Sequence, residues 1–442
     1  MILRVSTSAG RLAFLVIAVL LALFLSFYSI RSAWAEHEAS SGTLQDLERA
    51  TRLEPGHAEN WYLLGRYWQY NLEDPDNEKA IRAYQNALSF DPHSAQTYVD
   101  LATAYEGQDD IADARENFLK AKHAYPLSAE VSWRVGNFFL RQGELDQAFQ
   151  QIRQSVAADP SRGAEAFTRS LRVEPDLEVV LDRALPPNPV VYVDIIHDLA
   201  DEGQTAVALQ LWDRLVKLQP SPRLGLNDVY HLVDALRNQR NFAEANRVWN
   251  QGVALSDLPD LGDPPASVLW DGGFESGFRN EGYAWAFPAN VHGVEIQLDK
   301  KEKHSGQQSL RLSFDGKLDI SFADVCHNAP VAPRTSYLLS GWVQTRDLTS
   351  DQGVRLRIHS AIPGAGSTFT PEVHGTQAWS QIDVLWTSEA DAREAQVCIV
   401  RLPSDQPDSR IRGSAWFDDV ALTPQLTEPP PSPATSRRSA KP

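Results

Sequence analysis

Prolines recur at a fixed interval in the first half of the chain. Pro92, Pro126 and Pro160 are each 34 residues apart, and Pro55 lies 37 residues before Pro92. A period of this length is typical of a repeat that folds as two antiparallel helices, with the proline ending the second helix. One such pair cannot bury its apolar face alone, so successive pairs must stack. The period therefore predicts an all-α solenoid.

The residues inside each period predict how the helices pack. Apolar residues spaced i, i+3 and i+7 give each helix one buried stripe, and a small residue where two helices cross lets their backbones approach. In the clearest unit these positions are Tyr98, Leu101, Ala102, Tyr105, Ala114, Phe118, Ala121 and Pro126. The neighbouring units have Gly65 and Gly136 at the crossing.

The pattern extends in both directions along the chain. Two weaker units contain Tyr192 and Val229, and residues 163–185 form a truncated or degenerate repeat. A half-unit at residues 44–55 precedes the array, and its partner would be the continuation of an apolar N-terminal helix. We therefore expect the solenoid to start almost at the end of that helix.

These matched positions resemble the tetratricopeptide repeat family over roughly residues 36–257. The resemblance implies a superhelix whose inner groove, lined by the first helix of each pair, binds protein partners. By motif phase the groove residues are Tyr62, Arg66, Gln69, Tyr70, Val99, Thr103, Trp133, Asn137 and Arg141. Alternatively, Tyr62 and Trp133 cover the seam between repeats. The basic clamp that some family members use for C-terminal carboxylates is not evident.

An uncharged apolar segment, Leu12 to Ile30, precedes the repeats. As a helix it spans roughly 28 Å, close to the bilayer's hydrocarbon thickness of about 30 Å. Arg4 and Arg11 precede it, which predicts a cytoplasmic stub and anchor at residues 1–35. We expect a single-pass protein of a bacterial inner membrane, with most of the chain periplasmic or otherwise extracytoplasmic. A signal peptide cleaved after residues 33–35 is the alternative.

Charge and missing motifs exclude several classes of function. The chain has 41 basic and 58 acidic residues, a net charge of −17 that repels phosphate backbones, so we expect no nucleic-acid partner. The sequence contains no Gly-rich phosphate loop, G-x-S-x-G or HExxH motif, and its 11 histidines lack paired metal-ligand spacing. We therefore expect that the chain is not an enzyme.

A linker at residues 258–265 separates the repeats from a segment with the pattern of a β domain, residues 266–424. Short alternating apolar runs are bounded there by Gly, Pro, Asp and Ser, which predicts a two-sheet antiparallel sandwich. The expected strands are 294–298, 308–314, 318–325, 336–345, 354–360, 380–387, 395–401 and 415–422. The tail, residues 425–442, is rich in Pro and Ser and is expected to be disordered.

Four strings in this segment resemble the jelly-roll carbohydrate-binding modules of the galactose-binding-like superfamily: WDGGFESG, HSGQQSLRLSF, YLLSGWVQT and WFDDVAL. The resemblance implies a structural calcium held by Glu275 with Asp418 or Asp419, whose oxygens suit that ion. Alternatively, these carboxylates only cap turns.

Sugar binding needs exposed aromatic faces. Trp285 and Trp379, which have polar or aromatic neighbours, are the expected glycan platform, whereas Trp342 and Trp416 are expected in the core. Cys326 and Cys398 lie in or beside apolar runs, and export would allow them to form a disulfide. Two free buried thiols are the alternative.

The expected protein is a membrane-anchored scaffold that binds protein through its repeats and polysaccharide through its sandwich. The order of parts is similar to accessory proteins of cell-envelope or exopolysaccharide assembly. A protein–protein adaptor with a purely structural sandwich, or a sandwich that targets an enzyme partner to its substrate, are the alternatives.

Overall fold

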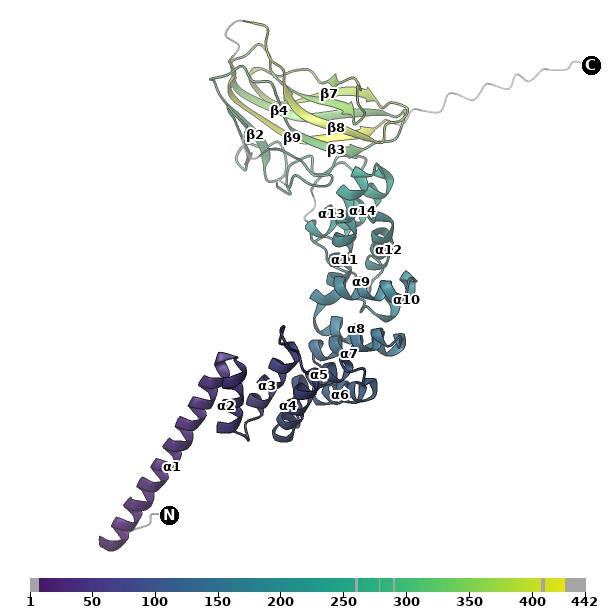
Figure 1. Cartoon of the computed structure of the whole chain (residues 1–442). Helices are drawn as coiled ribbons and strands as arrows, with labels where there is room; N and C mark the ends of the chain where they lie inside the picture. The colour runs from purple at the N-terminus through teal and green to yellow at the C-terminus, as the bar shows by residue number, and fades with distance from the viewer. Residues whose placement is uncertain (1–7, 259–260, 278, 289–290, 407–409, 426–442) are drawn as a thin grey trace, which may run out of the picture. The chain divides into compact units, whose positions relative to one another are not determined.

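The computed structural model describes residues 8–258, 261–277, 279–288, 291–406 and 410–425. It divides into two compact units, Met1–Val191 and Tyr192–Pro442. The first contains helices α1 to α10, and the second contains the last helices and a β-sandwich (Figure 1). The boundary falls before the expected linker because the final helix pair contacts the sandwich, through an ion pair between Arg237 and Glu394 for example.

Helix α1 (Ser8–Ser41) contains the apolar segment and continues beyond it without a break. It is long and apolar enough to cross a membrane, and the window of highest hydropathy is fully exposed. Its last turns change character, because Ala35 and Ala39 are buried against α2 (Leu44–Leu53). The helix with the apolar segment is thus also the first helix of the repeat array.

The next helices form the predicted antiparallel pairs. They are α3 (Ala58–Tyr70) with α4 (Asn77–Phe90), α5 (Ala95–Glu106) with α6 (Ile111–Ala124), and α7 (Ala129–Arg141) with α8 (Leu145–Ala158). Polar residues cap several N-termini: Ser94 accepts a hydrogen bond from the backbone N–H of Thr97, and Ser128 from that of Val131. These caps begin the helices directly after the repeat prolines.

Glycines occupy the closest helix crossings. A Cβ added to Gly65 would lie 2.6 Å from the ring of Tyr84, and one added to Gly136 would lie 2.9 Å from Ile152. The small-residue requirement inferred from the period therefore has a direct steric cause.

The array then becomes irregular. A 3₁₀ turn, η1 (Pro160–Arg162), leads into α9 (Gly163–Val173) and the short α10 (Leu177–Arg183), where the truncated repeat was predicted. Four further helices follow: α11 (Pro189–Asp201), α12 (Thr205–Leu215), and α13 (Asn227–Asn238), which packs against α14 (Phe242–Ala254). Trp212 and Trp249 are buried in them.

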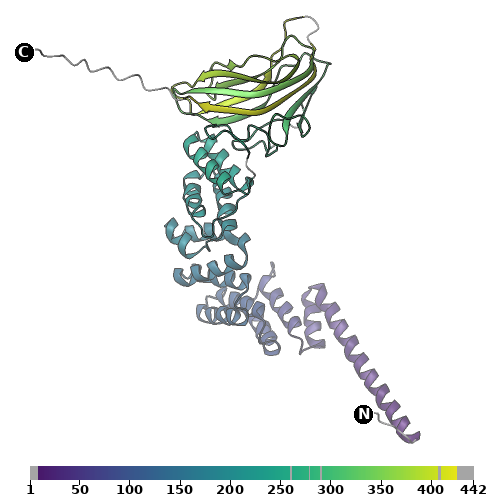
Figure 2. The ribbon, with the colours of Figure 1, turned by 180° about the vertical axis from the view of Figure 1, so that it is seen from behind.

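The β domain is a sandwich of two antiparallel sheets, seen from the front in Figure 1 and from behind in Figure 2. The five-stranded sheet has the order β1-β2-β9-β4-β7 and the four-stranded sheet has β3-β8-β5-β6. The strands are β1 (Val294–Asp299), β2 (Ser309–Asp315), β3 (Phe322–Pro330), β4 (Ser336–Leu348), β5 (Val354–Ser360), β6 (Thr368–Phe369), β7 (Gly375–Thr387), β8 (Glu394–Arg401) and β9 (Arg412–Pro424). This is the jelly-roll arrangement that the sequence indicated.

Several strand predictions were inaccurate. Strand β7 begins five residues before the expected 380–387, and β9 begins three residues before the expected 415–422. The strand expected at residues 318–325 is β3, which starts later and runs to Pro330, and the two-residue β6 was not predicted. In β3 the register shifts between Phe322 and Val325, so strict alternation is lost where the strand begins.

Cys326 on β3 and Cys398 on β8 are direct register partners and are joined in a disulfide, with a Cα–Cα distance of 4.1 Å. The bond links two neighbouring strands of the four-stranded sheet.

Candidate functional site

The inner side of the repeats has a cleft of about 720 Å³, and residues of α5, α6, α7, η1 and α9 line it. Four of the predicted groove residues, Thr103, Trp133, Asn137 and Arg141, are among its lining residues. They come from two successive repeats, so the motif phase places them on one surface.

Trp133 is not an exposed contact residue. Only 8% of its surface is exposed, and the guanidinium groups of Arg162 and Arg169 lie 5.5 and 5.3 Å from its ring centre. Asn137 is also engaged: it donates to the carbonyl oxygen of Trp133 and accepts from Arg169. The covering-seam alternative therefore describes Trp133, and the arginines above it are what reach the cleft.

Acidic residues form ion pairs with Arg134, Arg141 and Arg162 and hold these side chains in place. Arg141 donates to both carboxylate oxygens of Glu106 at 2.7 Å, while Arg134 and Arg162 both donate to Glu130, at 2.7 and 2.8 Å. Burial acts to raise the pKa of Glu130, but the hydrogen bonds from Arg134 and Arg162 hold that pKa below its usual value. Glu130 is therefore ionised at neutral pH.

Four of the five remaining predicted groove residues, Tyr62, Arg66, Gln69 and Tyr70, lie outside this cleft in a separate group. The Tyr62 hydroxyl donates to the buried carboxylate of Asp100 at 2.9 Å, and Gln69 donates to the Asp100 carbonyl oxygen. Burial, followed by the Asp100 charge, raises the pKa of Tyr62, so its hydroxyl stays protonated. The Arg66 guanidinium lies near the rings of Tyr62 and Tyr70.

Val99 was also expected in the groove, and this was wrong. Its side chain is 1% exposed and belongs to the apolar core between α5, α6 and α7. A helix that packs on both of its neighbours buries more positions than the motif phase alone indicates.

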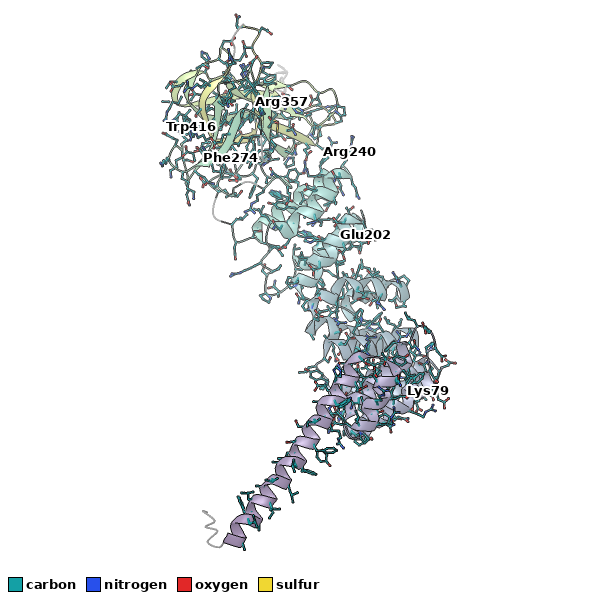
Figure 3. The ribbon with its side chains drawn as sticks, turned by 60° about the vertical axis from the view of Figure 1, so that its left-hand side comes forward. Lys79, Glu202, Arg240, Phe274, Arg357 and Trp416 are labelled. Carbon is teal, nitrogen blue, oxygen red and sulfur yellow. A yellow bond between two sulfur atoms is a disulfide. The ribbon has the colours of Figure 1, made fainter. Side chains whose placement is uncertain are left out.

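The predicted role of Trp285 as a glycan platform is wrong. This residue is 2% exposed, donates its indole N–H to the carbonyl oxygen of Asp271, and packs against Phe274. Figure 3 labels Phe274 among the side chains of the sandwich. The segment before β1 folds back onto the sandwich and buries its aromatic residues, which no local pattern in the sequence showed.

The outer face of the five-stranded sheet carries the exposed aromatic group instead. Trp342 on β4 lies opposite Asp418 and Gln381, and its neighbours Gly341 and Val343 face the core. Trp342 is thus on the outer face and half-buried, which corrects its expected place in the core.

An imidazole completes this aromatic group. The ring of His304 stacks on Trp342, with ring centres 3.9 Å apart and planes within 12°. His304 and Trp379 also form an edge-type ring contact, with ring centres 5.8 Å apart. Trp379 on β7 is half-buried. We call Trp342, His304 and Trp379 the aromatic triad.

Trp416, labelled in Figure 3, is buried as expected, but arginine side chains cover it. The guanidinium groups of Arg311 and Arg346 lie 5.5 and 4.9 Å from its ring centre, and its indole N–H donates to Asp299. It therefore offers no free face to a sugar.

The three carboxylates predicted to bind calcium do meet, at the turn of residues 304–308. Glu275 accepts the backbone N–H of Gln307 at 2.7 Å, and Asp418 accepts those of His304 and Ser305 at 2.7 and 3.1 Å. Asp419 bonds the side chains of His304 and Ser305. Burial raises the pKa of Asp418 to about 6.

Calcium takes six to eight oxygen ligands, whereas in the structure the oxygens of Glu275, Asp418 and Asp419 accept hydrogen bonds from N–H and O–H groups. Over residues 8–258, 261–277, 279–288, 291–406 and 410–425, no group of three or more His, Cys, Asp or Glu side chains is placed to hold a metal ion. The hydrogen bonds of Glu275, Asp418 and Asp419 are those expected if these carboxylates cap turns.

Comparison with known proteins supports the repeats. Residues 99–163 match the tetratricopeptide repeat family. A tRNA(Glu)-specific nuclease, WapA of Bacillus subtilis subsp. natto, is 26% identical over 203 residues, which is 44% of this chain and 8% of the nuclease. The general transcriptional corepressor ssn6 of Schizosaccharomyces pombe is 27% identical over 143 residues, 28% of this chain and 13% of that protein. This chain thus spans only a small fraction of either relative.

Solved structures resemble each half of the chain. A family 61 carbohydrate-binding module in complex with β-1,4-galactotriose is 17% identical, with 36% of this chain and 99% of the module covered and a TM-score of 0.26. YrrB, described as a TPR protein with an unusual peptide-binding site, is 14% identical, with 48% of this chain and 93% of YrrB covered and a TM-score of 0.25.

Proposed function

We propose that this chain is a membrane-anchored scaffold that binds a protein partner in its repeat groove and glycan on its β-sandwich. The observation that carries the proposal is the cleft on the inner side of the repeats, because residues of successive repeats line it together. A concave surface with arginines and half-exposed polar groups is suited to a protein partner.

The proposed location follows from α1. Its apolar, fully exposed part would span a bacterial inner membrane once, and the basic residues before it would stay in the cytoplasm. The repeats and the sandwich would then be periplasmic or otherwise extracytoplasmic. Such a scaffold fits cell-envelope or exopolysaccharide assembly, in which the solenoid organises partners at the membrane and performs no catalysis itself.

Site-specific photo-crosslinking tests the groove. A photoreactive amino acid at Thr103, which lines the cleft, should capture one defined protein in cells. The same group at Arg82, exposed on α4 and outside the cleft lining, is the control. Equal capture at both positions, or none at Thr103, would contradict groove binding.

The aromatic triad supports the glycan half of the proposal. Half-buried indole rings flanked by Gln381 resemble the aromatic and polar mixture that sugar rings bind. The full chain in detergent should bind at least one polysaccharide on a glycan array, and Trp379→Ala should weaken this binding. Tyr125→Ala, which removes an exposed aromatic ring of the repeats, is the matched control. Binding to no polymer would favour the adaptor alternative, in which the sandwich is structural.

Structural calcium is a separate proposal, based on the family resemblance alone. If the ion binds at Glu275 and Asp418, it must replace the hydrogen bonds that these residues now make. Calcium should then raise the melting temperature of the full chain and a chelator should lower it. An unchanged melting temperature would favour turn capping.

A further inference from the structure

A second cavity, of about 680 Å³, lies in the second compact unit between α14 and one end of the β-sandwich. Its aromatic lining residues are Phe242, Trp249, Trp270, Tyr283 and Tyr337. Trp249, Tyr283 and Tyr337 are almost fully buried, whereas Phe242 and Trp270 are half-buried and present ring surface. The repeat cleft and the aromatic triad share none of these residues, so this cavity, which we call the aromatic pocket, is a separate site.

The lining of the aromatic pocket includes hydrogen-bond donors that the described residues leave unpaired. The buried indole N–H of Trp270 has no partner among them. Asn246 accepts a hydrogen bond from Asn250 through Oδ1, and its own NH₂ group donates to no described residue. An occupant that is rich in acceptors and poor in donors therefore suits this lining.

The described part of the chain ends at the rim of the aromatic pocket. In β9 the carbonyl oxygen of Leu422 accepts the backbone N–H of Val268, and Pro424 is the register partner of Tyr337. Val268 and Tyr337 both line the pocket. Residues 426–442 therefore continue the chain from a point beside the pocket.

The sequence beyond this point contains a proline-rich segment, PPPSP at residues 429–433. The connection from Gln425 to Pro429 is four residues long and can span at most about 14 Å. Proline supplies a carbonyl acceptor but no N–H donor. Proline-rich segments also dock in aromatic-lined grooves, and their polyproline II conformation needs no core of its own. Five residues in that conformation are about 15 Å long.

One charge in the lining agrees with this occupant. Arg393 is exposed and donates to the carbonyl oxygen of Ala392, and among the described residues it makes no ion pair. Glu428 directly precedes the prolines in the sequence. The other charged residue of the lining, Asp263, already accepts two backbone N–H groups. Opposite charges at a rim favour one orientation of the occupant.

We propose that the chain's own segment of residues 428–433 occupies the aromatic pocket, with its prolines against Phe242 and Trp270 and with Glu428 beside Arg393. The inference goes beyond the proposed function and does not depend on binding of a partner protein or a glycan. Because the segment is tethered a few residues away, its effective concentration at the pocket is on the order of millimolar, so even a weak site stays filled.

Competition with a free peptide tests the inference. A labelled peptide of residues 426–442 is titrated in detergent against the full chain and against a chain that ends at Gln425. The shortened chain should bind the peptide about tenfold or more tightly than the full chain, because its pocket is empty. A peptide with Pro430→Ala and Pro431→Ala should bind the shortened chain about tenfold more weakly, since it loses the preformed conformation.

A substitution in the lining locates the site. Ala243→Trp places a large ring at an exposed position of α14 in the pocket lining, and it should weaken peptide binding to the shortened chain about tenfold or more. Ala112→Trp, at an exposed alanine of α6 outside the lining, is the matched control and should change nothing. Both variants should keep the melting temperature of the shortened chain, which separates a blocked pocket from unfolding.

Each result decides the proposal. It is supported if the shortened chain binds the peptide and the full chain binds it much more weakly. Equal binding to the two chains, no binding to the shortened chain, or binding that neither Ala243→Trp nor the proline replacements change would overturn it. A full chain that is dimeric and becomes monomeric on removal of residues 426–442 would also overturn it, because the segment would then occupy the pocket of a second copy.

Discussion

Two buried aspartates of the sandwich show how strongly single residues depend on their surroundings. Asp271 is 1% exposed and accepts the backbone N–H groups of Glu275 and Ser276, yet burial still raises its pKa to about 6. Asp418 has the same property, with the Asp419 charge adding to the effect of burial. Both residues support the turns around the same edge of the sandwich.

The raised pKa of Asp271 predicts a specific pH dependence. The folded state binds the Asp271 proton more tightly than the unfolded state does, so this residue contributes less stability as the pH rises from about 4 to 6. Asp271→Asn removes that change. The unfolding free energy of the variant minus that of the unsubstituted protein should therefore rise by about 2 to 3 kcal/mol from pH 4 to pH 7.

Urea unfolding of both proteins at several pH values measures this difference. Asp271→Asn also loses an oxygen that accepts from Ser276, so a constant offset between the proteins is expected in addition. An offset that does not vary with pH would show that Asp271 ionises normally in the folded protein.

At the scale of elements, stability depends on helix crossings that only small residues allow. Gly136 on α7 lies directly over Ile152 of α8, and a Cβ there would also approach the carbonyl oxygen of Ala148 at 3.3 Å. Backbone atoms cannot move aside as a flexible side chain can.

Gly136→Leu should therefore push α7 and α8 apart and cost about 1 to 3 kcal/mol through overpacking. The melting temperature of the repeats, followed by helical circular dichroism, measures the effect. Gly56→Ala is the matched control, because a Cβ at Gly56 would meet nothing within 4 Å. Equal melting temperatures for the two variants would mean that the crossing lies elsewhere.

The disulfide connects two elements that are distant in sequence. Cys326 and Cys398 are 72 residues apart, and closing such a loop restricts the unfolded chain by roughly 4 kcal/mol in the loop-closure model. A reducing agent should thus lower the melting temperature of the sandwich. Thiol titration of the denatured, unreduced chain should find no reactive thiol, and two reactive thiols would exclude the bond.

At the scale of the whole molecule, the continuity of α1 links the apolar segment to the first repeat. The helix runs through the small-x-small sequence Ala33-Trp34-Ala35, and Ala35 is already packed against α2. Removing everything up to that site would take away part of a packed helix as well as the apolar segment.

Protein extracted from membranes should therefore retain Met1 to Trp34. Mass spectrometry of the intact amino terminus provides the measurement. An amino terminus at Glu36 would show instead that the segment is a cleaved signal.

The sequence alone determined those features that depend on neighbours along the chain. The 34-residue period predicted the helix pairs because each pair is a local unit, with a cap, an apolar stripe and a small crossing residue close together in sequence. The alternation of apolar with polar residues along β4 and β5 predicted these strands for the same reason. The link between α1 and the repeats was also predicted from a half-unit of local pattern.

Only the tertiary structure decided which side chains lie together and which are exposed. Trp285 is buried because its own segment folds back so that the ring packs against Phe274 and against His327 of β3. Trp342 faces outward because strand register sets its side of the sheet. The arginine cluster combines a regular repeat with the irregular turn at Pro160–Arg162, so no single period contains it. These outcomes depend on contacts between residues far apart in sequence, and a local pattern carries no information about them.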